Sequence, residues 1–285
     1  MPSPNKTQQQ ADFDLVHKVI TKASLLKDEI IVVKIPSLIL NDQALMSQFL
    51  KNISLLNACD ARILLVHDYS DMVETTMDLF GIDKSILSNM HVSDHKYASV
   101  VEMVLTGYIN KKIVAELCQI GCKAVGISAK DGELIRARQK TKKLASNNVV
   151  NFGFVAEPVM VNPELILTLL ESNMIVVLSP VAMCDNGSTC LIDTNVTTAL
   201  IASSLAAKYL VLPAQNPNIN ADGILLTEDN KKLFKQMHSD LASTPEFKEI
   251  LDTALSALNN YVDYVCITDA SKVDAVVQTI FYGIE

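Results

Sequence analysis

The sequence predicts an α/β protein with a mainly parallel sheet covered by helices on both faces. Two observations predict it. Apolar runs of strand length alternate with amphipathic helical segments along the chain. Most strand runs are apolar at every position, which is typical of strands buried on both faces. With 285 residues, 49% of them hydrophobic, the chain is long enough for one large domain or two lobes that share a sheet.

Apolar periodicity and capping residues define the elements of the N-terminal half. Asn41 or Asp42 is suited to begin a helix, and Gly81 and Gly121 are suited to end helices. Gly107 is a candidate bend inside the last helix of this half. The predicted order is a helix at 12–26, a strand at 29–35, a helix from 41 or 42 to about 58, a strand at 63–66, a helix at 71–81, a helix from 93 or 94 to 121 and a strand at 123–127.

The C-terminal half continues the same alternation. Its clearest helix start is "NPEL", with Asn162 as the N-cap, Pro163 in the first position and Glu164 in the first turn. The predicted elements are a strand at 149–157, a helix at 163–172, a strand at 174–180, a helix at 193–208, a strand at 208–214, helices near 228–242 and 245–259, a strand at 261–267 and a helix from 272.

Charge and cysteine usage narrow the class of protein. The net charge is −8 and the pI about 5.2, which argues against binding to nucleic acid or to an anionic membrane. The six cysteines form no CxxC pair, so we expect reduced thiols and no metal site. The polar start "MPSPNKTQQQADF" is not typical of a signal peptide, and no apolar run reaches about 18 residues. We therefore expect a cytoplasmic protein.

Four stretches carry a family resemblance. They are "VVEMVLTGYINKKIV", "KAVGISAKDGELIRARQK", "NFGFVAEPVMVNPELI" and "SPVAMCDNGSTCLIDTNVTTALIA". Their sequence and order resemble acetylglutamate kinases of the amino-acid kinase family. The resemblance runs from Glu29 to the C-terminus and implies a three-layer αβα sandwich, the amino-acid kinase fold. It also implies a tail and helix at 1–28, a substrate-binding lobe at 29–205 and a nucleotide-binding lobe at 206–285.

The resemblance implies a reaction in arginine biosynthesis, in which ATP with Mg²⁺ phosphorylates the side-chain carboxylate of N-acetylglutamate. Such chemistry depends mainly on positioning and charge neutralisation. The family's first phosphate lysine is present as Lys34, but the glycine pair after it is replaced by Pro36-Ser37. Pro36 has no N–H to offer a phosphate.

The turn "VHDYS" departs further from the family pattern. His67 matches, but Asp68, Tyr69 and Ser70 stand where the family has a glycine triplet. Their side chains occupy space that the phosphoryl group needs. Asp68 would also repel an anionic ligand by about 4 kcal/mol at roughly 4 Å near a protein surface. Without the resemblance, the turn is an ordinary strand–helix connection with Ser70 as the N-cap.

Other substrate positions are substituted as well. The arginine that holds the substrate carboxylate aligns with His91, and the asparagine that contacts the substrate aligns with Leu191. A neutral imidazole cannot make the bidentate pair of an arginine. The aspartate that orients the lysines aligns with Asn195, although a shift of two residues would bring Asp193 to that place.

The nucleotide lobe is equally altered. The family's Thr-Asp-Val-x-Gly turn is replaced by "PAQNP", which begins with Pro213 and Ala214. The second catalytic lysine aligns with Ile250, and Lys248 is the nearby candidate to substitute for it. The chain stops at "FYGIE", where arginine-sensitive members continue to a glycine-threonine ending. Sensitivity to arginine stays open.

The pattern of matches favours one functional hypothesis over another. Sheet-building stretches match the family, whereas positions that would touch ligands do not. We expect a protein impaired in phosphotransfer and kept as a structural or regulatory subunit, which needs ATP and Mg²⁺ only if it is active. The alternative is an active kinase for N-acetylglutamate or another small carboxylate. A metal site at His67, Asp68 and His91 lacks a supporting spacing pattern.

The resemblance also bears on partners. The family pairs through its substrate lobes, and in hexameric members a helix before the first strand joins neighbouring dimers. The helix at 12–26 has a similar place and length. We expect a homodimer or a hexamer, with an active paralogue as a further candidate partner, and neither nucleic acid nor a membrane. An amphipathic helix could equally dock on its own subunit.

Overall fold

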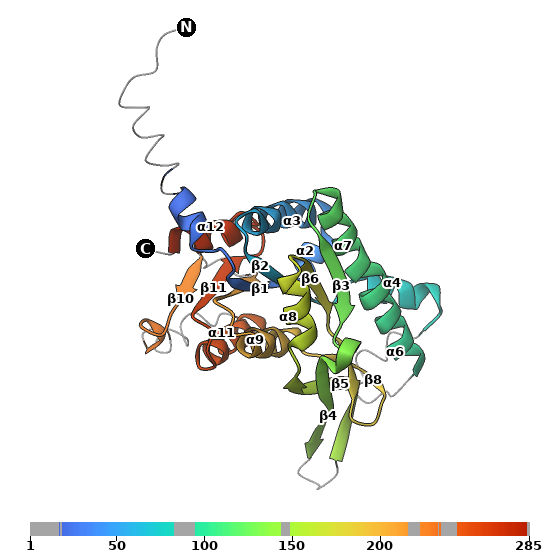
Figure 1. The fold of residues 1–285 in the computed structure, drawn as a ribbon. Helices are drawn as coiled ribbons and strands as arrows, with labels where there is room; N and C mark the ends of the chain where they lie inside the picture. The colour runs from blue at the N-terminus through green and yellow to red at the C-terminus, as the bar shows by residue number, and fades with distance from the viewer. Residues whose placement is uncertain are drawn as a thin grey trace.

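The computed structural model describes residues 17, 19–82, 95–143, 149–215, 223–232, 234 and 244–283. A seven-stranded sheet with the order β10-β11-β9-β1-β2-β6-β3 forms its centre (Figure 1). Neighbouring strands are parallel except at the β10–β11 edge. The strands are β1 (Ile30–Ile35), β2 (Arg62–His67), β3 (Ala124–Ser128), β6 (Ile175–Ser179), β9 (Tyr209–Ala214), β10 (Ile224–Leu226) and β11 (Tyr264–Asp269).

Helices cover both faces of this sheet, as the sequence predicts (Figure 1). One apolar core lies between the sheet and α8 (Glu164–Glu171), α9 (Thr194–Ser204) and α11 (Pro245–Leu258). The core on the other face contacts α2 (Ser37–Asn41), α3 (Gln43–Ala58), α4 (Met72–Leu79), α6 (His95–Glu102), the π-helical segment η1 (Met103–Ile109), α7 (Asn110–Gln119) and α12 (Ala275–Gly283).

A small closed barrel projects from one end of the sandwich, and the sequence reading did not predict it (Figure 1). Its strands are β4 (Ile135–Lys143), β5 (Val149–Val161), β7 (Val181–Cys184) and β8 (Thr189–Ile192), and the short 3-10 turn η2 (Asp131–Glu133) precedes it. The strand expected at 149–157 extends to Val161. Because β7 and β8 have four residues each and lie beside a polar turn, their apolar pattern is too short to indicate strands.

Most predicted helix starts have a structural counterpart. The Asp42 side chain accepts hydrogen bonds from the amides of Ala44 and Leu45 and caps α3. Asp71, not Ser70, is the N-cap residue of α4, although the Ser70 hydroxyl still accepts from the Met72 amide at 3.3 Å. The bend expected at Gly107 corresponds to η1, which contains this residue.

Three predicted helices extend outside the described residues, and one of them, expected from 93 or 94, is described from His95. Another, at 12–26, is helical at His17 and from Val19 to Ser24. The third, near 228–242, is described only at 228–232 and 234. Within the described ranges, no helix is long and apolar enough to cross a membrane.

Candidate functional site

The candidate site lies where β1 and β2 end, beside the N-terminus of α9. Ligands of α/β proteins bind at this edge, outside the carboxyl ends of parallel strands. Lys34 is the second-last residue of β1 and pairs in register with Val66 of β2. The chain leaves β2 through a turn in which the Asp68 amide donates to the carbonyl of Ile35 at 2.9 Å. This bond fixes the Asp68 backbone at the end of β1.

Lys34 and Asp68 form an ion pair at this edge. The Lys34 Nζ lies 3.1 Å from Asp68 Oδ2 and donates to Asn195 Oδ1 at 2.6 Å. The Lys34 side chain is only 6% exposed, so its ammonium needs partners of this kind. The Asp68 side chain is 23% exposed. The structure therefore brings together the retained lysine, the substituted glycine turn and the position of the organising aspartate.

The other Asp68 oxygen is held just as firmly. Asp68 Oδ1 accepts from the Tyr69 amide and from Thr194 Oγ1, both at 2.9 Å. Thr194 begins α9, so the carboxylate links the turn after β2 to this helix. The sequence reading missed Thr194 because its role depends on how α9 meets the sheet.

The rest of the turn packs against α2. Ser70 Oγ donates to Asn41 Oδ1 at 2.9 Å, and the Asp71 amide donates to the same oxygen at 3.2 Å. The Tyr69 side chain is half-buried, and burial together with the neighbouring Tyr97 raises the pKa of its hydroxyl. Hydrogen bonds to the Asn41 side chain therefore hold this turn in place, where the family pattern has glycines with free backbone amides.

His67 is buried as a neutral side chain. Its Nδ1 lies 3.1 Å from the carbonyl oxygen of Asp68, and its Nε2 has no hydrogen-bond partner in the described part of the chain. Burial lowers the pKa of His67 to about 4, against a smaller opposing effect of Asp68. The described residues include no group of three His, Cys, Asp or Glu side chains able to hold a metal ion.

Apolar side chains nearly fill the space around Leu191, the position that aligns with the substrate asparagine. Tyr97 and Phe154 face each other there with ring centroids 5.6 Å apart, and Val181 and Cys190 complete part of the wall. The remaining cavity is about 10 Å³. This volume is about the least that can hold one water molecule. His91, which aligns with the substrate arginine, lies outside the described residues.

Lys130 links strand β8 of the barrel to helix α6 through Thr189 and Glu102. Its Nζ lies 2.6 Å from Glu102 Oε1 and donates to Thr189 Oγ1 at 2.7 Å. Thr189 in turn donates to Glu102 Oε2 at 2.9 Å. The turn "SAKDG" thus has a structural role that accounts for this lysine.

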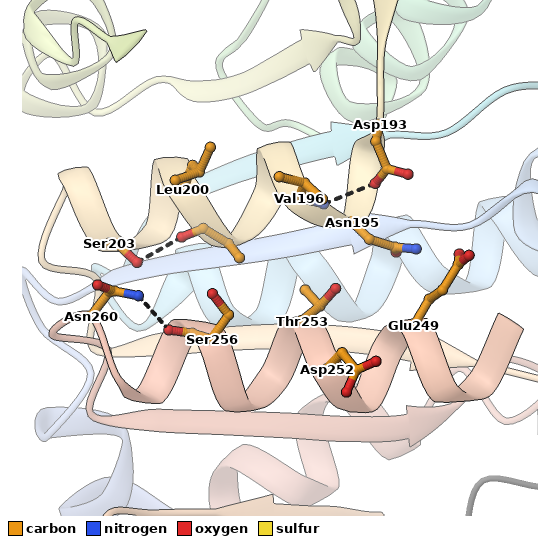
Figure 2. Close-up of a pocket in the computed structure, with 11 residues that line it drawn as sticks. Asp193, Asn195, Val196, Leu200, Ser203, Glu249, Asp252, Thr253, Ser256 and Asn260 are labelled. Atoms are coloured by element: carbon orange, nitrogen blue, oxygen red, sulfur yellow. Dashed lines mark hydrogen bonds between the residues drawn. The ribbon is translucent and has the colours of Figure 1, made fainter. Parts of the chain in front are cut away.

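An open groove of about 370 Å³ runs between α9 and α11 beside Asn195 (Figure 2). Asp193, Glu249 and Asp252 line it, and the described lining includes no lysine or arginine. Asp193 is the N-cap of α9 and accepts from the Val196 amide at 2.9 Å. Asp193 therefore caps the helix, whereas Asn195 is the residue that contacts Lys34.

The remaining predicted nucleotide positions do not converge on Lys34. Pro213 and Ala214 are buried at the end of β9, where they pair in register with Thr268 and Asp269. Lys248 is exposed on α11, next to the groove residue Glu249. The side chain at the aligned position of the second lysine, Ile250, is buried in the core.

Comparison with known families decides the relationship. The amino acid kinase family matches residues 29–269. The chain belongs to this family. Among curated relatives, an acetylglutamate kinase of Methylobacterium nodulans is 30% identical, with 96% of each chain covered. Another from Archaeoglobus fulgidus is 31% identical over 88% of this chain and 89% of its own.

Solved structures agree on the amino acid kinase fold. An N-acetylglutamate synthase from Neisseria gonorrhoeae superposes with a TM-score of 0.70 at 17% identity, over 93% of this chain. This chain spans only 60% of that synthase. Giardia carbamate kinase superposes with a TM-score of 0.61 at 14% identity, over 87% of this chain and 96% of its own. The chain is thus an acetylglutamate-kinase-like member of the family.

The described residues beside Lys34 do not fit the polyphosphate of ATP, the nucleotide that the family implies. Lys34, the lysine that would neutralise a phosphate, is already paired with Asp68. The adjacent groove carries carboxylates, which repel a polyphosphate.

Proposed function

We propose that this acetylglutamate-kinase-like protein is impaired in phosphotransfer and serves as a structural or regulatory subunit. The contact between Asp68 and Lys34 carries the proposal. An incoming phosphoryl group would have to displace a carboxylate that has three hydrogen-bonding partners, Lys34, Tyr69 and Thr194. Displacing it would also leave its negative charge beside the phosphoryl group.

The substrate side supports the same proposal. A small dicarboxylate needs far more space than the cavity of about 10 Å³ beside Tyr97, Phe154 and Leu191. The lining residues include no lysine, arginine or histidine, and the Thr189 hydroxyl among them is already bonded to Lys130 and Glu102. Side chains of the protein therefore lie at the phosphoryl position and in this part of the substrate side, which supports the proposal.

The alternative function is an active ATP-dependent kinase for N-acetylglutamate or another small carboxylate. Two observations favour it. Lys34 is retained at its family position and contacts Asn195 at the position of the organising aspartate. The similarity to acetylglutamate kinases also extends over 96% of the chain.

An ADP-release assay separates the two functions. The purified protein is incubated with Mg-ATP and N-acetylglutamate, then with a panel of small carboxylates, and the acetylglutamate kinase of Archaeoglobus fulgidus serves as the positive control. We expect ADP to be released no faster than in the reaction without a carboxylate substrate. Substrate-dependent ADP release would establish the alternative.

We further propose that the protein is a homo-oligomer, a homodimer or a hexamer, in the cytoplasm. Val19, Ile20 and Leu25, around the N-terminal helix, are each about half exposed or more, which leaves an apolar surface for a neighbouring subunit. All six cysteines are free thiols, consistent with a reducing compartment.

Light scattering after gel filtration measures the mass of the particle in solution, and the mass of a monomer would refute the proposed assembly. Co-purification with an active paralogue tests the regulatory role.

A further inference from the structure

The donors around Asp68 are those that bind an oxyanion. Asp68 accepts from the Lys34 ammonium, the Tyr69 backbone amide and the Thr194 hydroxyl. An ammonium, an amide and a hydroxyl directed at the two oxygens of one carboxylate form an anion site whether or not the anion belongs to the chain. Here the chain supplies the anion itself.

These donors come from three separate elements. Lys34 belongs to β1, Tyr69 to the turn after β2, and Thr194 is the first residue of α9. The carboxylate therefore joins three parts of the fold at the edge of the sheet. Lys34 is 5% exposed as a residue, so the loss of the carboxylate would leave a buried ammonium with Asn195 Oδ1 as its neutral partner.

We propose that Asp68 is an internal replacement for an anionic ligand, an autoinhibitory contact that fills an oxyanion site. It holds β1, the turn after β2 and α9 together without any bound ligand. This inference rests on the proposed function and deepens it, because it identifies the residue that closes the site. Its consequence is a latent site: when the carboxylate is removed, the same donors accept a tetrahedral oxyanion.

Anion titration of Asp68→Ala tests the inference. Thermal unfolding of the full-length protein is followed against inorganic phosphate and sulfate, with chloride holding the ionic strength constant. We expect the variant to melt several degrees below the wild type, and phosphate to raise its midpoint saturably by several degrees. Binding of phosphate is then measured directly by calorimetry.

Four controls separate the site from general effects of salt. The wild type and Asp68→Asn should show no saturable response, because a side chain still fills the site. The double variant K34M/D68A should not respond either, because it lacks the cation. Asp28→Ala removes an exposed carboxylate that pairs with Arg62 at 3.2 Å, and it should melt independently of phosphate.

Each result bears on the inference. A flat phosphate titration of folded Asp68→Ala overturns it, and so does an equal response from K34M/D68A. If Asp68→Ala does not fold, Asp68→Ser is titrated instead, and failure of both to fold in phosphate also overturns it, since phosphate should replace the carboxylate. ADP release by the wild type refutes the proposed function. An inactive wild type with an unresponsive Asp68→Ala refutes this inference alone.

Discussion

The ammonium of Lys34 lies 3.1 Å from the carboxylate of Asp68, at the ends of two adjacent parallel strands. Lys34 is the retained phosphate lysine of the family pattern, and Asp68 stands at the first position of the substituted glycine turn. We propose that this one substitution takes the space of a phosphoryl group, and its carboxylate supplies the charge that pairs with the lysine.

The first prediction concerns stability. Replacing Asp68 with alanine leaves a buried ammonium without its counter-ion, and breaking a buried pair in this way costs about 3 kcal/mol. Asp28→Ala breaks an exposed pair with Arg62 and should change stability by less than about 0.5 kcal/mol. Urea unfolding of both variants measures the difference. If both variants lose the same free energy of unfolding, the buried ion pair stabilises the protein no more than the exposed one does.

Restoring the glycines alone should not restore a kinase. A variant with Asp68, Tyr69 and Ser70 all replaced by glycine regains backbone access, but Leu191 and Asn195 are unchanged. The tight cavity and the carboxylates of the groove also remain. We expect no N-acetylglutamate-dependent ADP release from this variant. Recovery of phosphotransfer would show that other residues supply the missing catalytic groups.

His67 should make stability fall in acid. Its pKa is about 4 in the fold, where burial favours the neutral form, against about 6.5 when exposed. The contribution of neutral His67 to the free energy of unfolding is complete above about pH 6.5. It is lost as the pH falls towards 4, which lowers the free energy of unfolding by about 3 kcal/mol. Urea unfolding of the wild type and of His67→Gln between pH 7 and 4 isolates this part from carboxylate titration. The same pH slope in both proteins would contradict it.

The contact between Gly126 and Asn110 gives a test of the fold. A Cβ at Gly126 would lie 1.8 Å from Asn110 Oδ1, and Asn110 is held by hydrogen bonds to the carbonyls of Ile127 and Val177. Gly126→Ala should therefore destabilise the protein by about 1–3 kcal/mol. Gly107→Ala is the matched control, because no described atom beyond its chain neighbours and its own helix backbone lies within 4 Å of its Cβ position. A neutral Gly126→Ala would indicate a different arrangement of α7 on the sheet.

The sequence predicts most of the central strands and helices in their order along the chain, because most central strands are continuous apolar runs. It does not predict the barrel, whose shortest strands have four residues. For the site, it identifies Lys34, Asp68 and Asn195, but it does not predict the ion pair that Asp68 forms with Lys34. The signal was present: parallel neighbours bring a lysine near one strand end close to an acid at the next.

Binding of Mg-ATP to the wild-type protein, measured by titration calorimetry, tests the central claim most directly. If Asp68 fills the site of Lys34, Mg-ATP should give no saturable heat and no increase in melting temperature, with or without N-acetylglutamate. Saturable binding of Mg-ATP that is lost in Lys34→Met would contradict the account, because it would place a nucleotide phosphate where the structure places the Asp68 carboxylate.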